Sequence, residues 1–185
     1  MRPTRRDEVV AGAWAFAEAT LFFVIPDVWL TWVAIQAKAA AKPLFWMVWY
    51  ATFAAVLGGL AIETLGTYAP KAAERAVLAV PSVSADDLTT VRGEYAEVGS
   101  RAVATGWLRG QPYKLYALVE GEQPGSARPF MYWSILARGG RFLLTTIVAF
   151  GLATLVGRPR AMRFVWATAW ACVYAAYWWM NPLWS

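Results

Sequence analysis

Charged side chains interrupt stretches of this sequence that are otherwise apolar. Glu18 and Asp27 lie nine positions apart in AEATLFFVIPDVWL, with Pro26 directly before the aspartate. A carboxylate in apolar surroundings is costly, and it persists when it forms an ion pair or faces a polar cavity that handles protons or ions. Asp27 also has a structural alternative, because an aspartate after a proline can cap the next helix.

A second apolar stretch carries the opposite charge. Arg109 and Lys114 flank Pro112 in AVATGWLRGQPYKLYALV. Arginine offers a planar, bidentate fork for phosphate, so these residues could hold the phosphate of a lipid. The alternative is that both side chains extend to a membrane interface, which is easiest for the long lysine stem.

A third pair of charges, Arg138 and Arg141, lies three positions apart in a later apolar segment. This spacing places both arginines on one face of a helix. We expect Arg138 to form a static ion pair with Glu18 or Glu63, and we keep Arg141 as a second cation of the site.

The composition is typical of a membrane protein. Of the 185 residues, 59% are hydrophobic and 16% are charged, against about 45–50% and 25% in soluble domains. The chain has no histidine and one cysteine, so the commonest metal ligand and general base is missing and no disulfide framework is expected. We predict no metal, no cofactor and no enzymatic activity; catalysis by carboxylates, Lys114 or Tyr113 is the weaker alternative. The basic residues are spread between apolar segments, which argues against nucleic-acid binding despite a net charge of +5.

The elements that position these charges are predicted to be all helical, in one membrane domain. A straight helix over 9–37 would span about 43 Å, more than the roughly 30 Å of a hydrocarbon core, and Pro26 breaks it. We therefore expect two short helices that enter and leave on one face. The expected elements are a polar arm (1–8), re-entrant hairpin 1 (9–37), a transmembrane helix (44–66), polar and amphipathic helices (67–101), re-entrant hairpin 2 (102–123) and transmembrane helices at 129–156 and 164–182.

The order of these elements indicates an internal repeat. AKPL at 41–44 and ARPF at 127–130 are offset by 86 positions, and the same offset carries Pro26 onto Pro112. The basic residues gather on one side of such a topology, which places the N-terminus in the cytoplasm. One spanning helix separates the hairpins, so the repeats are expected to be inverted, with a site at the membrane midplane. There the acids should face Arg109 and Lys114 across a cavity.

Three motifs in this order resemble the DedA superfamily, also called the SNARE-associated Golgi or VTT family, in its YqaA-like bacterial branch. The resemblance covers roughly residues 10–157. The motifs are Phe16-Ala17-Glu18-Ala19-Thr20 followed by Pro26-Asp27, Pro112-Tyr113-Lys114 with Gly121 further on, and Arg138-Gly139-Gly140-Arg141-Phe142.

The resemblance implies two re-entrant hairpins in inverted topology and a role in moving lipids across the bilayer, often tied to the proton-motive force. It implies functional roles for Glu18, Asp27, Arg109 and Lys114. We therefore expect a flippase or scramblase for a phospholipid or polyprenyl phosphate, in the bacterial inner membrane, with protons as a candidate coupling ion and a homodimer as a candidate assembly. The alternative is a non-transporting partner or assembly factor that acts through the helices of 67–101, with Leu88 and Val91 in the contact.

Overall fold

The computed structural model describes residues 3–37, 41–81, 83–157 and 159–180, and the secondary structure in these ranges is helical, as predicted. The elements, in chain order, are α1 (Arg5–Thr20), α2 (Asp27–Gln36), α3 (Ala41–Tyr68), α4 (Pro70–Leu78), α5 (Ala85–Val98), the 3-10 turn η1 (Gly99–Arg101), α6 (Ala102–Gly106), α7 (Tyr113–Glu122), α8 (Arg128–Val156) and α9 (Pro159–Met180).

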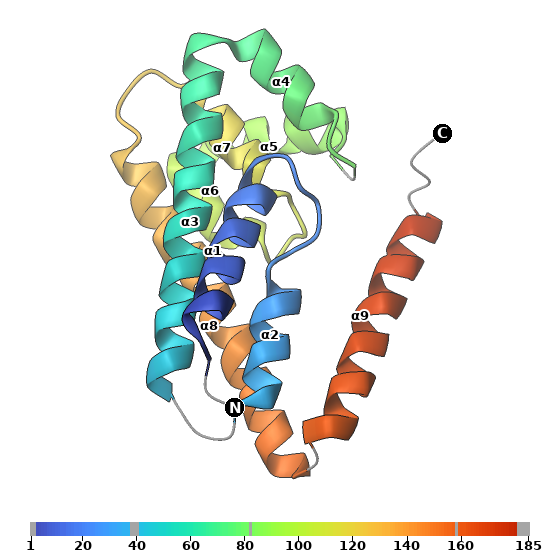
Figure 1. The fold of residues 1–185 in the computed structure, drawn as a ribbon. Helices are drawn as coiled ribbons and strands as arrows, with labels where there is room; N and C mark the ends of the chain where they lie inside the picture. Colours follow the sequence, from blue (N-terminus) through green and yellow to red (C-terminus); the bar gives the residue numbers. More distant parts are fainter. Residues whose placement is uncertain (1–2, 38–40, 82, 158, 181–185) are drawn as a thin grey trace.

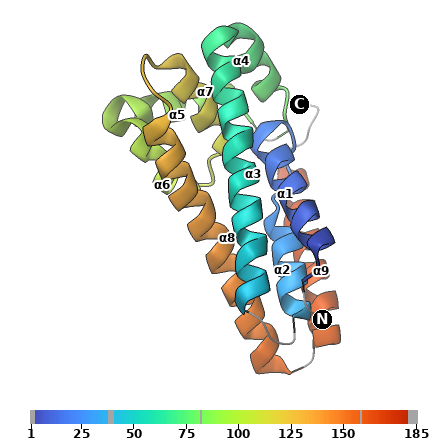
Figure 2. The same cartoon turned by 60° about the vertical axis from the view of Figure 1, so that its left-hand side comes forward.

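The long helices α3 and α8 run in opposite directions through the length of the molecule (Figure 1). The first helical pair, α1 and α2, lies beside them: α1 packs on α3, and α2 packs on α8 and α9. The second helical pair, α6 and α7, contacts α8 and α3. Helices α4 and α5, called the polar cap below, lie at one end of the long helices (Figure 2).

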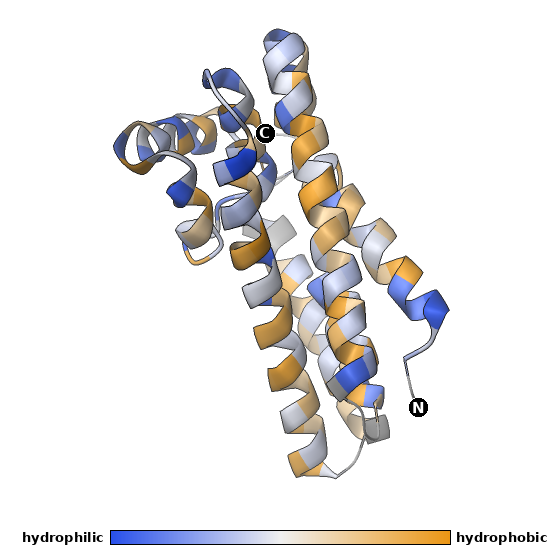
Figure 3. Cartoon of the chain, turned by 90° about the vertical axis from the view of Figure 1, so that its left-hand side faces the viewer, coloured by the Kyte–Doolittle hydropathy of each residue, from blue (hydrophilic) through white to orange (hydrophobic). Residues whose placement is uncertain are grey.

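Two helices of the described residues are long and apolar enough to cross a membrane, Lys42–Tyr68 and Arg128–Val156. Figure 3 shows apolar residues along both of them and polar residues gathered at the capped end. They coincide with the spans expected at 44–66 and 129–156. The third expected span, 164–182, falls on α9 as far as Met180, but α9 is not one of these two helices. Residues 181–182 lie outside the described ranges, and the inverted repeat stays a prediction.

Both expected helix breaks occur at the two prolines. Pro26 is the N-cap residue of α2, and Pro112 is the N-cap residue of α7. Proline has no N–H to donate, so the first positions of a helix, where N–H groups lack partners anyway, accept it without losing a bond. The segments 21–26 and 107–112 therefore separate two short helices in each pair.

The polar arm expected at 1–8 is shorter in the structure, which is a correction to the prediction. Helix α1 begins at Arg5, because Thr4 and Asp7 form a capping box that satisfies exposed N–H groups at its start. The same device occurs further along the chain, where Ser84 and Asp87 cap α5. Both sites have the hydroxyl-x-x-acid spacing, so the first could have been found by the same criterion.

The polar cap is attached by apolar and charged contacts. Leu88, Val91 and Tyr95 of α5 are buried as their spacing predicted, whereas Val98 is exposed. Arg92 binds Glu74 at 2.7 Å and Glu122 at 2.5 Å, which joins α5 to α4 and to the end of α7. The hydrogen bond that Arg92 donates to Glu122 is the largest cause of the raised pKa of Arg92, so this arginine stays charged at physiological pH.

Candidate functional site

The acid of α1 is paired with an arginine of α8. Arg138 Nη2 lies 2.5 Å from Glu18 Oε2, and the two side chains are only 4% and 8% exposed. This is one of the two pairings expected for Arg138. A charge buried to this extent needs a partner, because desolvation costs several kcal/mol per ion. The opposite charges of Glu18 and Arg138 therefore offset the cost of burying each other.

The acid of α2 has its own arginine one helical turn further along α8. Arg141 Nη2 lies 2.7 Å from Asp27 Oδ2, and the Thr145 hydroxyl donates to Asp27 Oδ1 at 3.0 Å. Asp27 is also the first residue of α2, where a negative charge favours the helix dipole. The capping alternative is wrong, because Pro26 is the N-cap residue and the Asp27 side chain makes no capping hydrogen bond.

Tyr113 supports Arg138 from the second helical pair. The Arg138 guanidinium carbon lies 4.2 Å from the centroid of the Tyr113 ring, and this ring stacks on Phe130 with an interplanar angle of 14°. A cation above an aromatic face is attracted by the ring quadrupole. Gly59 of α3 makes room, because a Cβ there would collide with the Tyr113 ring.

Lys114 links the two helical pairs through a backbone contact. Its Nζ donates to the carbonyl oxygen of Phe22 at 2.7 Å, and the residue is 2% exposed. Phe22 belongs to the break between α1 and α2. Among the described residues no carboxylate lies within 4.0 Å of Lys114. The site thus contains a buried cation whose charge is not neutralised by an ion pair.

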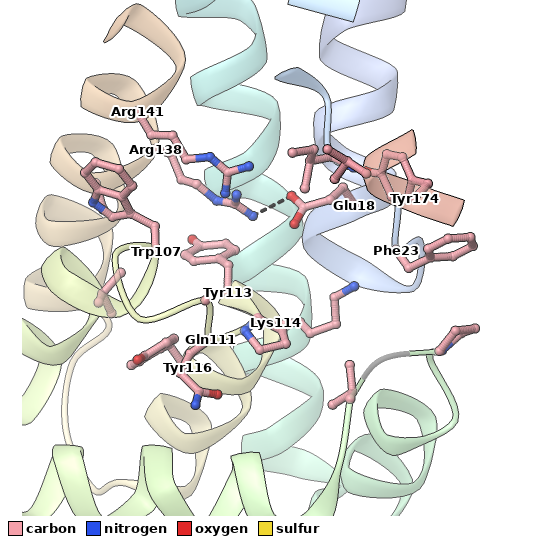
Figure 4. A pocket seen from close by; sticks show the side chains of 18 of the residues that line it. Glu18, Phe23, Trp107, Gln111, Tyr113, Lys114, Tyr116, Arg138, Arg141 and Tyr174 are labelled. Carbon is pink, nitrogen blue, oxygen red and sulfur yellow. Dashed lines mark hydrogen bonds and ion pairs between the residues drawn. The ribbon is translucent and has the colours of Figure 1, made fainter. Parts of the chain in front are cut away.

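These charges line a cavity of about 460 Å³ between the two helical pairs and α9 (Figure 4). The charged residues of its lining are Glu18, Lys114, Arg138 and Arg141. Asp27, outside the lining, pairs with Arg141, so three cations against two carboxylates leave a formal charge of +1, that of Lys114. Trp170, Val173 and Tyr174 of α9 form an apolar and aromatic wall. The arrangement is suited to an anionic group with an apolar neighbour.

Arg109 does not face Glu18 or Asp27 across the cavity, so this part of the prediction is wrong. It lies outside the cavity lining and forms an ion pair with Glu94 of α5 at 2.5 Å, with 56% of its side chain exposed. Glu94 also accepts a hydrogen bond from the Tyr116 hydroxyl at 2.7 Å. The turn at Gly110, with φ of 78°, separates Arg109 from Lys114, and a charge at the surface avoids the cost of burial.

No protein-family model, curated protein or solved structure matches the chain. The site is therefore assigned from its own geometry, and the resemblance to the DedA superfamily stays a prediction. Within the described residues, the aspartate, glutamate, histidine and cysteine side chains form no group of three or more that could hold a metal ion.

Two contacts of the site were missed from the sequence. The Asp27–Arg141 pair has a detectable signal, since Arg141 and Thr145 are four positions apart and share a face with Arg138. The second contact is the Tyr174 hydroxyl of α9, which accepts a hydrogen bond from the Ile25 N–H at 3.0 Å. It satisfies a donor at the break before α2, and no pattern in the sequence indicates it.

Proposed function

We propose that this protein moves an anionic lipid across a membrane, a phospholipid or a polyprenyl phosphate, through the cavity between the two helical pairs. The observation that carries the proposal is the excess of positive charge in the buried lining. Lys114 has no carboxylate partner, whereas Arg138 is paired with Glu18 and Arg141 with Asp27. A phosphate group would supply the missing negative charge and accept several hydrogen bonds from these donors.

The surroundings of the cavity favour a lipid over a water-soluble anion. One of the helices that line it, α8, is a candidate membrane span, and α9 places Trp170 and Val173 at its edge. A volume of about 460 Å³ is in the range of small-ligand pockets, roughly 300–1,000 Å³. It accommodates a head group, while acyl or prenyl chains would stay beside the exposed apolar residues of α9.

The proposed mechanism is an exchange of partners. The lipid phosphate binds Lys114 first, since that cation has no acid to displace, and then competes with Glu18 for Arg138. Protonation of Glu18 would weaken its hold on Arg138 and would couple the exchange to a proton gradient. The proposal includes inverted hairpins that open to opposite faces, a bacterial inner-membrane location with the N-terminus in the cytoplasm, and a homodimer.

The test is a lipid-exposure assay on purified protein in liposomes. A fluorescent phospholipid is placed in both leaflets and an impermeant reducing quencher is added outside, with and without a pH gradient. Empty vesicles are compared with wild type, Lys114→Gln and Arg109→Gln. Wild type and Arg109→Gln should expose the inner-leaflet lipid, and Lys114→Gln should not. The proposal fails if wild type matches empty vesicles for phosphatidylethanolamine and for a polyprenyl phosphate.

If wild type matches empty vesicles, the transport proposal would be replaced by the alternative of a non-transporting partner or assembly factor. The contact expected for that role is not free, because Leu88 and Val91 are 2% and 0% exposed within the chain itself. A partner would have to bind the polar face of the cap, and substitution of Leu88 or Val91 would act through the stability of the fold.

A further inference from the structure

The end of α8 nearest the polar cap carries two hollows that are separate from the transport cavity. The first, the basic groove, has a volume of about 530 Å³. Its lining is Val98, Ser100, Arg101, Arg128, Pro129, Tyr132 and Trp133. No carboxylate of the described residues lies within 4.0 Å of either arginine. Two guanidinium groups without an ion pair, in a groove that Tyr132 and Trp133 also line, form a site for an anion such as a phosphate.

The second, the acidic hollow, has a volume of about 720 Å³. It contains the carboxylates of Glu63 and Glu120 and no basic side chain, and its other polar lining consists largely of hydroxyls, from Thr64, Thr67, Tyr68, Tyr95, Ser100 and Ser126. Neither carboxylate has a cation within 4.0 Å among the described residues. The two acids repel each other, so a cation between them would relieve that repulsion.

Tyr95 provides a second sign that the acidic hollow takes a ligand. The residue is 6% exposed, and its hydroxyl interacts with the Glu120 carboxylate but makes no hydrogen bond of normal geometry within the described structure. Burial and the charge of Glu120 raise the pKa of Tyr95, so the hydroxyl stays protonated. A buried hydroxyl without a well-formed hydrogen bond is unfavourable. A polar ligand in the hollow would satisfy it.

The two hollows adjoin, because Ser100 and Pro129 belong to the lining of both. A basic site and an acidic site side by side match a ligand that carries both charges a few bonds apart. We propose that they bind the head group of an aminophospholipid of the phosphatidylethanolamine type, with the phosphate in the basic groove and the primary ammonium in the acidic hollow.

The position on α8 favours a membrane lipid over a soluble phosphoamine. The candidate span of this helix begins at Arg128 itself, which is where lipid phosphates meet the hydrocarbon. Tyr132 is 58% exposed and Met131 39% exposed just beyond it. Tyrosine and tryptophan are enriched at this level of a membrane. Acyl chains would lie along the apolar part of α8, which begins below its polar end (Figure 3).

This site is independent of the proposed transport. Its lining shares no residue with the cavity that contains Lys114 and Arg138. The bound lipid would hold the start of α8 against η1 and the end of α3, and would act as a structural lipid rather than as cargo. The proposed lipid binding depends on the membrane location and not on the proposed transport. The variant Lys114→Gln, which should stop transport, should therefore leave this lipid binding unchanged.

The experiment measures the thermal unfolding midpoint of the purified protein in neutral detergent, with dioctanoyl lipids added at equal concentration. Dioctanoyl phosphatidylethanolamine should raise the midpoint by several degrees. Phosphatidylglycerol, which lacks the ammonium, and phosphatidylcholine, whose ammonium has no N–H, should raise it by less than half as much. Glycerophosphoethanolamine, which lacks acyl chains, should have no effect at that concentration.

Variants assign the two halves of the head group. The double variant Arg101→Gln/Arg128→Gln should lose the shift for every lipid. Glu63→Gln should reduce the phosphatidylethanolamine shift to the phosphatidylglycerol value, and Glu120→Gln should do the same if it folds. Lys114→Gln is the matched control and should keep the wild-type shifts. Equal shifts from the three lipids, a full shift from glycerophosphoethanolamine, or an unchanged shift in the double arginine variant would each overturn the proposal.

Discussion

Lys114 of α7 donates a hydrogen bond to the carbonyl oxygen of Phe22, in the break between α1 and α2, at 2.7 Å. This contact joins the two helical pairs at the point where the first is not helical. It uses one of the three protons of the ammonium group, so two donors stay available to a ligand in the cavity. Lys114 can therefore keep its hydrogen bond to the segment between α1 and α2 and still bind an anion through its other two N–H groups.

We expect Lys114→Gln to lower lipid exposure in liposomes about tenfold or more, because the proposed first contact of the phosphate is lost. The amide can still donate to the Phe22 carbonyl, so the fold should be kept. Arg109→Gln is the matched control, since that side chain lies outside the cavity lining and 56% of it is exposed. Equal loss in both variants would contradict the assignment of Lys114 to the site.

Glu18→Gln should destabilise the protein, because it leaves the Arg138 charge buried beside a neutral group. Breaking one half of a buried ion pair typically costs about 3–5 kcal/mol. Unfolding by titration with sodium dodecyl sulfate in mixed micelles measures this cost. The double variant Glu18→Gln/Arg138→Met removes both charges and should recover much of the loss. If the double variant is less stable than the single one, the pair is not the source of the cost.

The Asp27–Arg141 pair should show direct energetic coupling. A double-mutant cycle with Asp27→Asn and Arg141→Gln is expected to give an interaction energy of about 0.5–3 kcal/mol, as for residues in contact. Thr145→Val removes the hydroxyl that donates a hydrogen bond to Asp27, and it should lower the stability of the protein by a further amount of about 1 kcal/mol. A coupling energy near zero would show that the two charges are held by other groups.

Gly59→Ala should destabilise the protein, because the added methyl group collides with the Tyr113 ring that supports Arg138. Overpacking of this kind costs about 1–3 kcal/mol. Gly140→Ala in α8 is the control, since nothing lies within 4 Å of a Cβ built there, and alanine should be neutral or stabilising by up to about 1 kcal/mol. The same detergent titration compares the two; similar losses would argue against the proposed collision.

The breaks at Pro26 and Pro112 and the start of α5 at Ser84 could be predicted because each depends on local chemistry. A proline or a capping hydroxyl acts within one turn of its own position. The Glu18–Arg138 pair was one of two expected pairings, since an acid and an arginine in apolar helices have few other ways to offset their burial.

The partner of Arg109 could not be predicted in the same way. Its acid, Glu94, belongs to the polar cap, and the docking of α5 onto α7 depends on burial of Leu88, Val91 and Tyr95 rather than on any motif near Arg109. The Asp27–Arg141 pair requires α2 to lie on α8, a contact between segments 114 positions apart. Both are consequences of tertiary packing.

The distance along the chain between each acid and its arginine has a consequence for biosynthesis. Arg138 is the 120th residue added after Glu18, and at about 5–20 residues per second this takes roughly 6–24 seconds. During that interval the carboxylates of Glu18 and Asp27 lack the arginines that later pair with them. The two acids of the N-terminal segment can therefore reach their paired positions only after α8 has been synthesised.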